Sequence, residues 1–153
     1  MPSAIQIFVD ADACPVKREI YRVAERYKLR VKVVANSMMW VPEAAWIELI
    51  LAGDAFDAAD DWIVEHVAED DIVVTDDIPL ASRCLKKGAS VLTPKGRVFT
   101  DASIGEALAT RDVLSQLREH GLVHGGPAPF EPKDRSRFLQ RLDTMVQACL
   151  RQK

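Results

Sequence analysis

The chain alternates short apolar runs with longer amphipathic segments, and this pattern separates predicted strands from predicted helices. Runs rich in β-branched residues predict strands over residues 5–10, 31–35, 71–75 and 89–92. Apolar residues at helical spacing predict helices over residues 15–28, 42–51, 57–68, 79–87, 103–120 and 134–151. Residues 95–100 predict a turn followed by a short extra strand.

Residues at the ends of these segments support the assignment. Pro15 and Pro42 suit the first turn of a helix, where a missing N–H leaves no hydrogen bond unmade. Ser103 followed by Glu106 has the spacing of a capping box, which predicts that Ser103 caps the long helix that follows. Gly53 stands where the helix that begins at Pro42 should end.

Strands that alternate with helices predict right-handed βαβ crossovers and a mostly parallel sheet with helices on both faces. We therefore expect one α/β domain over residues 1–153, with a three-layer α/β/α, Rossmann-like architecture and helices from 103–151 packed on it. The first and third strands are the most apolar, which places them at the centre and gives the spatial order 2-1-3-4. Ligands of such sheets bind outside the carboxyl ends of the strands, where the strand order reverses.

Composition narrows the class of protein. Hydrophobic residues make up 48% and charged residues 28% of the 153 residues, the balance of a globular rather than a disordered chain. No apolar run approaches the roughly 18 residues of a membrane span, and two early aspartates argue against a secretory signal. Three cysteines without a CxxC pair indicate no disulfide framework or zinc site, and the spacing of His66, His120 and His124 indicates no histidine metal site. We expect a cytoplasmic protein that does not bind membranes.

Charge is divided unevenly along the chain, although the formal net charge is only −3. Residues 1–82 hold 7 Lys and Arg against 16 Asp and Glu, whereas residues 83–153 hold 13 against 7. An acidic half suits metal ions, and a basic half suits a polyanion. The plainer interpretation is two solvated faces that attract each other or a second copy of the chain, which would form a homodimer.

Aspartates follow both of the strands expected at the centre of the sheet. Asp10 and Asp12 follow the first strand, and Asp76 and Asp77 follow the third. Because parallel strands end at the same edge, these acids are expected to be neighbours. The helix before the third strand carries more acids toward the same crevice. They are Asp57 and Asp60, three apart on one helix face, with Asp54 and Asp61 as further candidates.

Converging carboxylates need a counter-charge. Two of them about 4 Å apart repel by about 4 kcal/mol at an effective dielectric of ~20, so several cannot all stay ionised alone. Mg²⁺ and Mn²⁺ prefer oxygen ligands, and one or two such ions clamp a phosphodiester and activate water for in-line attack. The plainer interpretation is that these aspartates cap helices and turns, where Asp is common.

Polar side chains elsewhere extend this hypothesis to substrate binding. Asn36 and Ser37 follow the second strand, so they either orient water or substrate at the acidic edge or simply form a turn. Lys17 lies in the first turn of a predicted helix, within reach of a phosphate or an acid. Basic residues that would steer or clamp a phosphate backbone, unless they only solvate surface helices, are Arg97, Arg135, Lys95 and Arg111.

Aromatic residues and one cysteine have two interpretations each. Trp40, Trp46 and Trp62 offer a base-stacking platform, but packing in a core or an interface is the more frequent use of Trp. Cys14 lies at an expected helix N-terminus, where the helix dipole lowers a thiol pKa, but a free cysteine more often packs as a small apolar residue.

Several motifs together resemble the YaiI/YqxD bacterial family. They are DADACPVK (10–17), DAADDWIV (57–64), TDDIPLA (75–81), TPKGRVFT (93–100), GGP (125–127) and DR (134–135), which span nearly the whole chain. That family is grouped with PIN-like domains, so the resemblance implies a PIN-like fold. PIN relatives are typically Mg²⁺- or Mn²⁺-dependent ribonucleases with acids clustered at the carboxyl edge of a parallel sheet. Acids that match the family's DAD, D-x-x-D and DIPLA motifs are Asp10, Asp12, Asp57, Asp60 and Asp77, whereas relatives can carry an uncharged residue at Asp76.

The favoured hypothesis is a divalent-metal-dependent nuclease or phosphodiesterase that acts on RNA. Those five acids would hold Mg²⁺ or Mn²⁺, and Asp10, Asp12 and Asp77 would serve catalysis, one of them aiding the deprotonation of water. The polar and basic residues that would bind substrate are Asn36, Ser37, Lys17, Arg97 and Arg135.

Two other functions use the same residues. An aspartyl-nucleophile phosphatase would use Asp10 as nucleophile and Asp12 as acid, but Cys14 stands where that class carries a threonine. A receiver-like or RNA-binding module without catalysis would use Asp57 as phosphoacceptor, with Lys95 as an imperfect match for the lysine that such a module needs.

Overall fold

The computed structural model describes residues 5–12, 14–122 and 128–152. Within these ranges the elements follow in the order β1 (Gln6–Asp10), α1 (Lys17–Tyr27), β2 (Arg30–Ala35), β3 (Ile47–Leu51), α2 (Ala58–His66), β4 (Ile72–Val74), α3 (Ile78–Lys86), β5 (Ser90–Leu92), β6 (Val98–Phe99), α4 (Asp101–Glu119) and α5 (Pro132–Arg151). The GGP motif at 125–127 and His124 lie outside the described residues.

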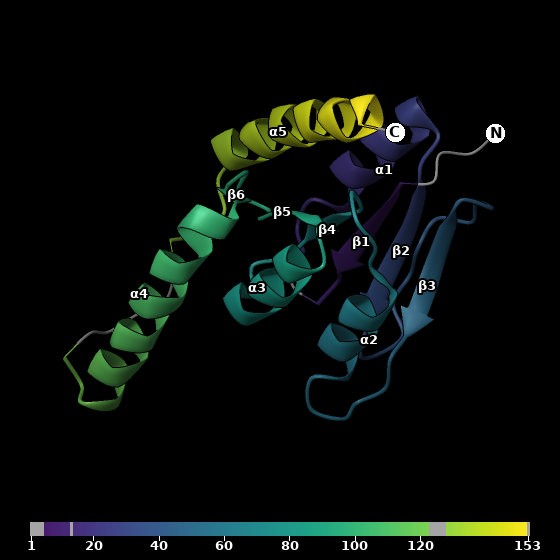
Figure 1. Ribbon diagram of the computed structural model, residues 1–153. Coiled ribbons are helices and arrows are strands. Elements are labelled where there is room, and N and C mark those ends of the chain that lie inside the picture. Colours follow the sequence, from purple (N-terminus) through teal and green to yellow (C-terminus); the bar gives the residue numbers. More distant parts are fainter. Residues whose placement is uncertain (1–4, 13, 123–127, 153) are drawn as a thin grey trace.

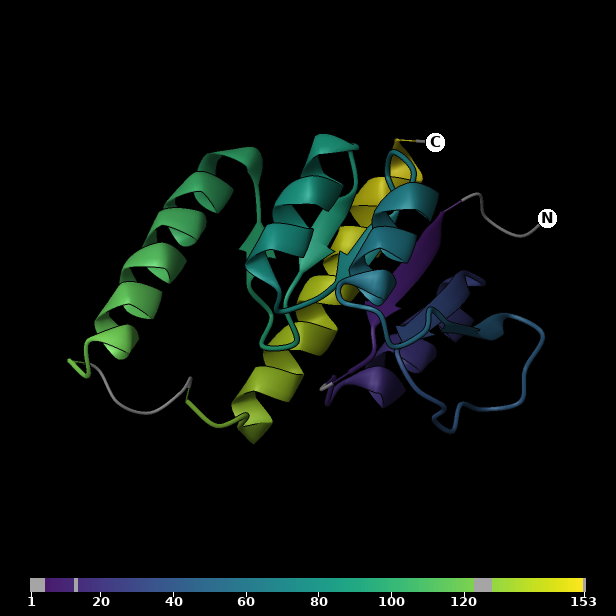
Figure 2. The same cartoon turned by 90° about the horizontal axis from the view of Figure 1, so that it is seen from below.

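Helices cover both faces of one sheet, as Figures 1 and 2 show. α1 and α5 pack together on one face, and α2 and α3 lie on the other. Each face has its own core, with Val9, Val23 and Phe138 in one and Phe8 and Ile63 in the other. Successive residues of β1 therefore point into opposite layers, as the pleat of a strand requires. This is the three-layer α/β/α fold that the sequence predicts.

The strand order confirms the predicted centre of the sheet. The order is β3-β2-β1-β4-β5-β6, so the four predicted strands β1, β2, β4 and β5 lie in the predicted order 2-1-3-4. The described strand pairs are parallel except for β5 with β6, and β6 is the short extra strand expected within 95–100. The carboxyl ends of β1 and β4 consequently lie side by side at the point where the strand order reverses.

The prediction of a helix over residues 42–51 is wrong. Ile47–Leu51 form β3, which pairs in parallel with β2. Lys32 of β2 and Glu48 of β3 form an ion pair across the two strands. A short apolar run fits a helix or a strand equally well by periodicity. The open edge of β2 decides between them, because its backbone N–H and C=O groups need partners that only a strand supplies.

The N-terminus of α4 is capped one turn earlier than Ser103. The Oγ1 atom of Thr100 accepts a hydrogen bond from the Ser103 backbone N–H at 3.1 Å, and the Ser103 Oγ atom accepts one from the Thr100 N–H at 2.9 Å. Two hydroxyls thus form the capping box, and the prediction with Ser103 as cap is wrong.

α4 extends away from the sheet, whereas α5 lies along α1 (Figure 1). Ile104 and Ala107 near the start of α4 are buried next to α3, but Leu122 just beyond its end is 70% exposed. Of the helices in the described ranges, none is both long enough and apolar enough to cross a membrane.

Candidate functional site

Acidic side chains from separate segments meet at the carboxyl edge of the sheet. Among the described residues, six aspartates line one cavity of about 420 Å³. They come from the end of β1, the loop before α2, the first turn of α2 and the start of α3, and they are Asp10, Asp12, Asp54, Asp57, Asp60 and Asp77. The rest of the lining is Asn36, Ala55, Phe56 and Ala59. Each of the five acids predicted to bind metal therefore lines the same cavity.

Asp10 is held in place by a side chain that the sequence analysis did not assign to the site. The Thr75 hydroxyl donates a hydrogen bond to Asp10 Oδ2 at 2.7 Å and accepts one from the Asp77 backbone N–H at 3.0 Å. Thr75 is 1% exposed, so packing fixes its position. It joins the ends of β1 and β4 and orients the Asp10 carboxylate. Its place in the sequence, between an apolar strand and two acids, is the signal that could have identified this role.

Asp12 is oriented in the same way by the residue that follows β2. The Asn36 Nδ2 atom donates a hydrogen bond to Asp12 Oδ2 at 2.9 Å. Asn36 lines the acidic cavity, as expected from its place after the second strand. Ser37 is exposed and lies outside the set of lining residues.

Helix capping accounts for one of these acids but not for another. Asp77 Oδ1 accepts a hydrogen bond from the Leu80 backbone N–H at 2.9 Å, so Asp77 caps α3 while it lines the cavity. Asp57 stands at the N-cap position of α2, but its side chain makes no capping bond. Its φ of 61° is left-handed, a conformation that is uncommon for a non-glycine residue. The Asp57 carboxylate is therefore left to face the cavity.

The convergence of carboxylates changes their protonation. Burial raises the pKa of Asp60 to about 7, and the charges of Asp77, Asp10 and Asp57 add to this rise while Arg83 opposes it. Burial also raises the pKa of Asp10, against the effect of the threonine hydrogen bond, and the neighbouring carboxylates raise it further. Without a counter-charge, the site is therefore ionised only at an energetic cost.

The oxygen-rich lining matches the ligand preference of a hard divalent cation. In the described part of the chain, no three Asp, Glu, His or Cys side chains are gathered tightly enough to make a ready-formed metal site. Mg²⁺ commonly binds through one or two carboxylates and keeps several waters, so it needs room between its protein ligands. None of the described residues that line the cavity is basic, and no sulfur is among them. This donor set fits a partly hydrated Mg²⁺ or Mn²⁺.

Two aspartates near the cavity do not line it. Asp61 forms an ion pair with Arg83 at 2.9 Å, and both side chains are substantially exposed. Burial raises the pKa of Asp76, and the charge of Lys95 lowers it. Asp76 is thus the acid of the TDD sequence that interacts with a lysine, whereas Asp77 belongs to the cavity.

Lys17 and Arg135 are occupied elsewhere. The Lys17 Nζ atom donates a hydrogen bond to the Cys14 carbonyl oxygen at 3.0 Å. The Arg135 guanidinium binds Glu19 at 2.6 Å and thereby joins α5 to α1. Neither is among the residues that line the acidic cavity, and their predicted role in substrate binding stays a prediction.

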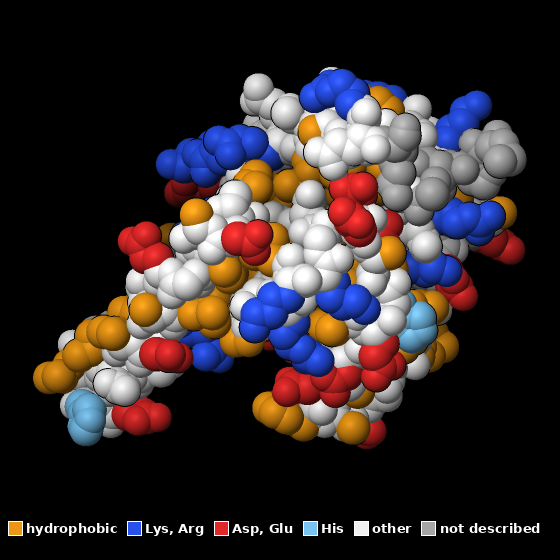
Figure 3. Space-filling view, in the orientation of Figure 1, with side chains coloured by type: hydrophobic (Ala, Val, Ile, Leu, Met, Phe, Trp, Pro, Cys, Tyr) orange, Lys and Arg blue, Asp and Glu red, His pale blue; other side chains and the backbone are white. Residues whose placement is uncertain are grey.

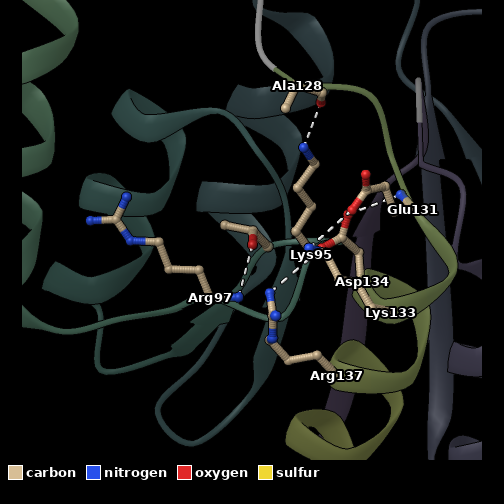
Figure 4. A network of polar contacts seen from close by, with 8 residues as sticks. Lys95, Arg97, Ala128, Glu131, Lys133, Asp134 and Arg137 are labelled. Atoms are coloured by element: carbon tan, nitrogen blue, oxygen red, sulfur yellow. Dashed lines mark hydrogen bonds and ion pairs between the residues drawn. The ribbon is translucent and has the colours of Figure 1, made fainter.

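Lys95 and Arg97 point in different directions (Figure 4). Lys95 donates a hydrogen bond to the carbonyl oxygen of Ala128, in the segment before α5. The Arg97 guanidinium lies over the Phe99 ring, 4.8 Å from its centroid, and is directed away from Lys95. Arg97 lines a different cavity, together with Arg111.

An aromatic side chain at the acidic cavity was missed by the sequence analysis. Phe56 lines the cavity and is 93% exposed, which is unusual for a large apolar residue. Among the tryptophans, Trp40 is 82% exposed, whereas Trp62 stacks on His66. Cys14 is buried, and burial raises its pKa, which favours the interpretation as a packed apolar residue.

Comparisons with known proteins agree with the motifs. A family model described as "Uncharacterized BCR, YaiI/YqxD family" matches residues 8–148, a span that contains the whole acidic cavity. A UPF0178 protein of Rhodopseudomonas palustris (strain BisB5) is 55% identical over 152 residues, covering 99% of this chain and 93% of the relative. A UPF0178 protein of Brucella ovis is 58% identical over 146 residues, covering 95% and 91%. One of Nitrobacter winogradskyi is 54% identical over 149 residues, covering 97% and 95%. No solved structure matches the chain significantly.

Proposed function

The chain belongs to the YaiI/YqxD family, and we propose that it is a divalent-metal-dependent nuclease that hydrolyses phosphodiester bonds of RNA. One observation carries the proposal: the six aspartates of the acidic cavity converge without a basic residue among the described lining. Buried like charges raise the energy of the folded protein, and such perturbed carboxylates cluster at functional sites. A bound cation accounts for why they are placed together.

The aspartates divide into ligands and the groups that orient them. The acids that would hold Mg²⁺ or Mn²⁺ are Asp10, Asp12, Asp57, Asp60 and Asp77. Thr75 fixes the Asp10 carboxylate, and Asn36 fixes that of Asp12, so two of the ligands are set before an ion arrives. When bound, the ion supplies positive charge that clamps the phosphodiester and lowers the pKa of water.

Hydrolysis then needs a base and a positioned water. The oxygen of water forms a bond to phosphorus, the bond from phosphorus to one ester oxygen breaks, and that oxygen takes a proton from solvent. One carboxylate among Asp10, Asp12 and Asp77 accepts the proton that the attacking water loses. Of these, Asp10 stands at the end of the central strand β1, where the Thr75 hydroxyl holds its orientation.

The proposal is tested by incubating the full chain with single-stranded RNA and Mn²⁺. Cleavage is expected, and Asp10→Asn should remove it while the fold is kept, because the amide oxygen still accepts the hydrogen bond from Thr75. Asp61→Asn is the matched control, since Asp61 adjoins Asp60 in sequence but lies outside the cavity lining.

Two outcomes would contradict the proposal. One is a wild-type protein that leaves RNA intact with Mn²⁺. The other is hydrolysis of small phosphate monoesters with a phosphoryl group trapped on Asp10, which would indicate an aspartyl-nucleophile phosphatase instead.

A further inference from the structure

A second cavity is lined by arginines and includes Ile78, the residue that follows Asp77 of the acidic cavity. It has a volume of about 370 Å³ and lies between the start of α3, the segment before β6 and one face of α4. The lining residues are Ile78, Arg97, Glu106, Ala107, Thr110, Arg111, Leu114 and Arg118. We call it the arginine cavity. In Figure 3, α4 stands apart from the rest of the molecule and leaves a hollow beside it.

The arginines of this cavity come together from two elements. Arg111 and Arg118 are seven residues apart in α4, which places them on the same helix face. Arg97 approaches from the segment before β6, where Figure 4 shows its guanidinium directed away from the start of α5. A cavity with basic groups on two walls can contact an anionic ligand from two sides.

Carboxylates of the described residues offset only part of the positive charge of the arginine cavity. In the described ranges, Arg97 and Arg118 form no ion pair, and the Arg111 guanidinium is paired only at 4.0 Å, with Asp112. Glu106 is the acidic residue of the described lining. By contrast, Arg135 is paired with Glu19 at 2.6 Å. A guanidinium without a carboxylate partner retains its donors for a phosphate, which it binds in a bidentate manner.

The linings of the two cavities are consecutive in sequence at the start of α3. Asp77 lines the acidic cavity, and Ile78, the next residue, lines the arginine cavity. Consecutive Cα atoms are about 3.8 Å apart, so the start of α3 contributes a wall to both cavities. We therefore expect a strand with a phosphodiester at the acids to approach the arginines when it extends past the start of α3.

We propose that the arginine cavity binds backbone phosphates of the single-stranded RNA whose phosphodiester is hydrolysed in the acidic cavity. This inference rests on the proposed function and specifies its substrate as a strand longer than a mononucleotide. Phe56 supports the single-stranded form, because its exposed ring at the acidic cavity can stack on an unpaired base, which a duplex does not present. The RNA is hydrolysed in the acidic cavity, while the arginine cavity binds its backbone and keeps the phosphodiester positioned at the aspartates.

The binding test separates this inference from catalysis. A fluorescein-labelled single-stranded oligoribonucleotide is titrated with the full chain in EDTA, so that no cleavage occurs, over a series of salt concentrations. The double variant Arg111→Gln/Arg118→Gln should bind about 10- to 100-fold more weakly, because two charge-assisted contacts are lost. The slope of log K, where K is the association constant, against the logarithm of the salt concentration should become less negative by about 1.4. Each phosphate contact on a single strand contributes about −0.7 to this slope.

The matched control removes the same charge from the opposite face. Arg22 in α1 and Arg141 in α5 are exposed, and these helices lie on the face of the sheet away from α3. Arg22→Gln/Arg141→Gln should bind as the wild type does. Equal affinity and equal salt slope in the arginine-cavity variant and this control would overturn the inference, as would tighter binding of duplex than of single-stranded RNA.

The two experiments distinguish a failure of the nuclease proposal from a failure of the arginine-cavity proposal. If the wild type binds RNA through the arginines but does not cleave it with Mn²⁺, the nuclease is contradicted and phosphate binding by the arginine cavity is supported. If it cleaves RNA and the arginine-cavity variant binds like the control, the arginine cavity is contradicted and the nuclease stands.

Discussion

Acidic side chains have different surroundings at the two ends of the sheet. At the amino end of β4, the buried Asp71 accepts hydrogen bonds from the backbone N–H groups of Gln6 and Ala68, both at 2.9 Å. At the carboxyl end of β1, Asp10 accepts one hydrogen bond, from the Thr75 hydroxyl, and faces other carboxylates. Backbone donors stabilise an ionised carboxylate, whereas like charges destabilise it. The same residue type is structural at one edge and suited to bind a cation at the other.

Other buried acids resemble Asp71 rather than Asp10. Glu19 is paired with Arg135 at 2.6 Å. Asp134 accepts a hydrogen bond from the Glu131 backbone N–H at 2.9 Å and lies 3.5 Å from Arg137, as Figure 4 shows. A buried acid whose charge is matched by an arginine or by backbone donors has a structural role, while acids that converge with no basic residue in the described cavity lining indicate a site that binds a cation.

The largest expected effect is on catalysis at the carboxyl edge. Asp10→Asn should lower the rate of RNA cleavage in Mn²⁺ by about 10²- to 10⁴-fold, the range for loss of an acid–base group. Its metal-free Tm should be equal to or above that of the wild type, because one of several repelling charges is gone. Rate and Tm are measured on the same preparation. A lower Tm with unchanged cleavage would reverse the assignment of Asp10.

At the amino edge the same kind of substitution should act on stability. Asp71→Ala leaves the backbone donors of Gln6 and Ala68 without their carboxylate and should lower the free energy of unfolding by about 3 kcal/mol. Thermal unfolding should show a fall of roughly 2–4 °C per kcal/mol. Asp112→Ala, at an exposed position of α4, is the control and should change stability by less than about 0.5 kcal/mol. A loss no larger than that of the control would show that Asp71 is dispensable.

Local signals account for the parts that the sequence predicts correctly. The strands β1, β2, β4 and β5 are short apolar runs, and their burial in the sheet makes such runs recognisable. Because parallel strands end at one edge, their order alone places Asp10 and Asp77 together. The acidic cavity could therefore be anticipated without any side-chain coordinates.

The features that were missed depend on contacts between distant segments. Ile47–Leu51 becomes a strand because β2 offers an open edge, which periodicity does not reveal. Thr75 acquires its role through a hydrogen bond to Asp10, 65 positions away in the chain. The arginine cavity depends on where α4 lies relative to Arg97, and nothing in the local sequence fixes that placement.

Metal binding should be visible as stabilisation. At a Mn²⁺ concentration 100 times the dissociation constant, the free energy of unfolding should rise by about 2.7 kcal/mol, because the ion binds the folded chain. Thermal unfolding with and without EDTA measures this rise. Asp10→Asn/Asp12→Asn should lose it, and Asp61→Asn should keep it, since Asp61 lies outside the cavity lining. A Tm that Mn²⁺ does not change in the wild type would contradict the metal site.

The smallest expected effect is the pH dependence that Asp60 contributes in the absence of metal. Its folded-state pKa of about 7 exceeds the ordinary 3.8, so the folded protein keeps a proton that the unfolded chain has already lost. The stability that Asp60 contributes to the folded state is therefore fully present below pH 3.8 and is lost as the pH rises through about 7. After allowance for solvent screening this amounts to about 1 kcal/mol.

Asp60→Asn should remove this dependence. In EDTA, the wild type should lose stability between acidic and mildly alkaline pH by about 1 kcal/mol more than the Asp60→Asn variant does. Denaturant unfolding across that pH range measures the difference, and Asp112→Asn should behave as the wild type because Asp112 is exposed in α4 and is not among the charges that act on Asp60. The charges that face Asp60 belong to Asp77, Asp10, Asp57 and Arg83. Identical pH profiles for the wild type and Asp60→Asn would show that these neighbours do not act on Asp60 as the geometry requires.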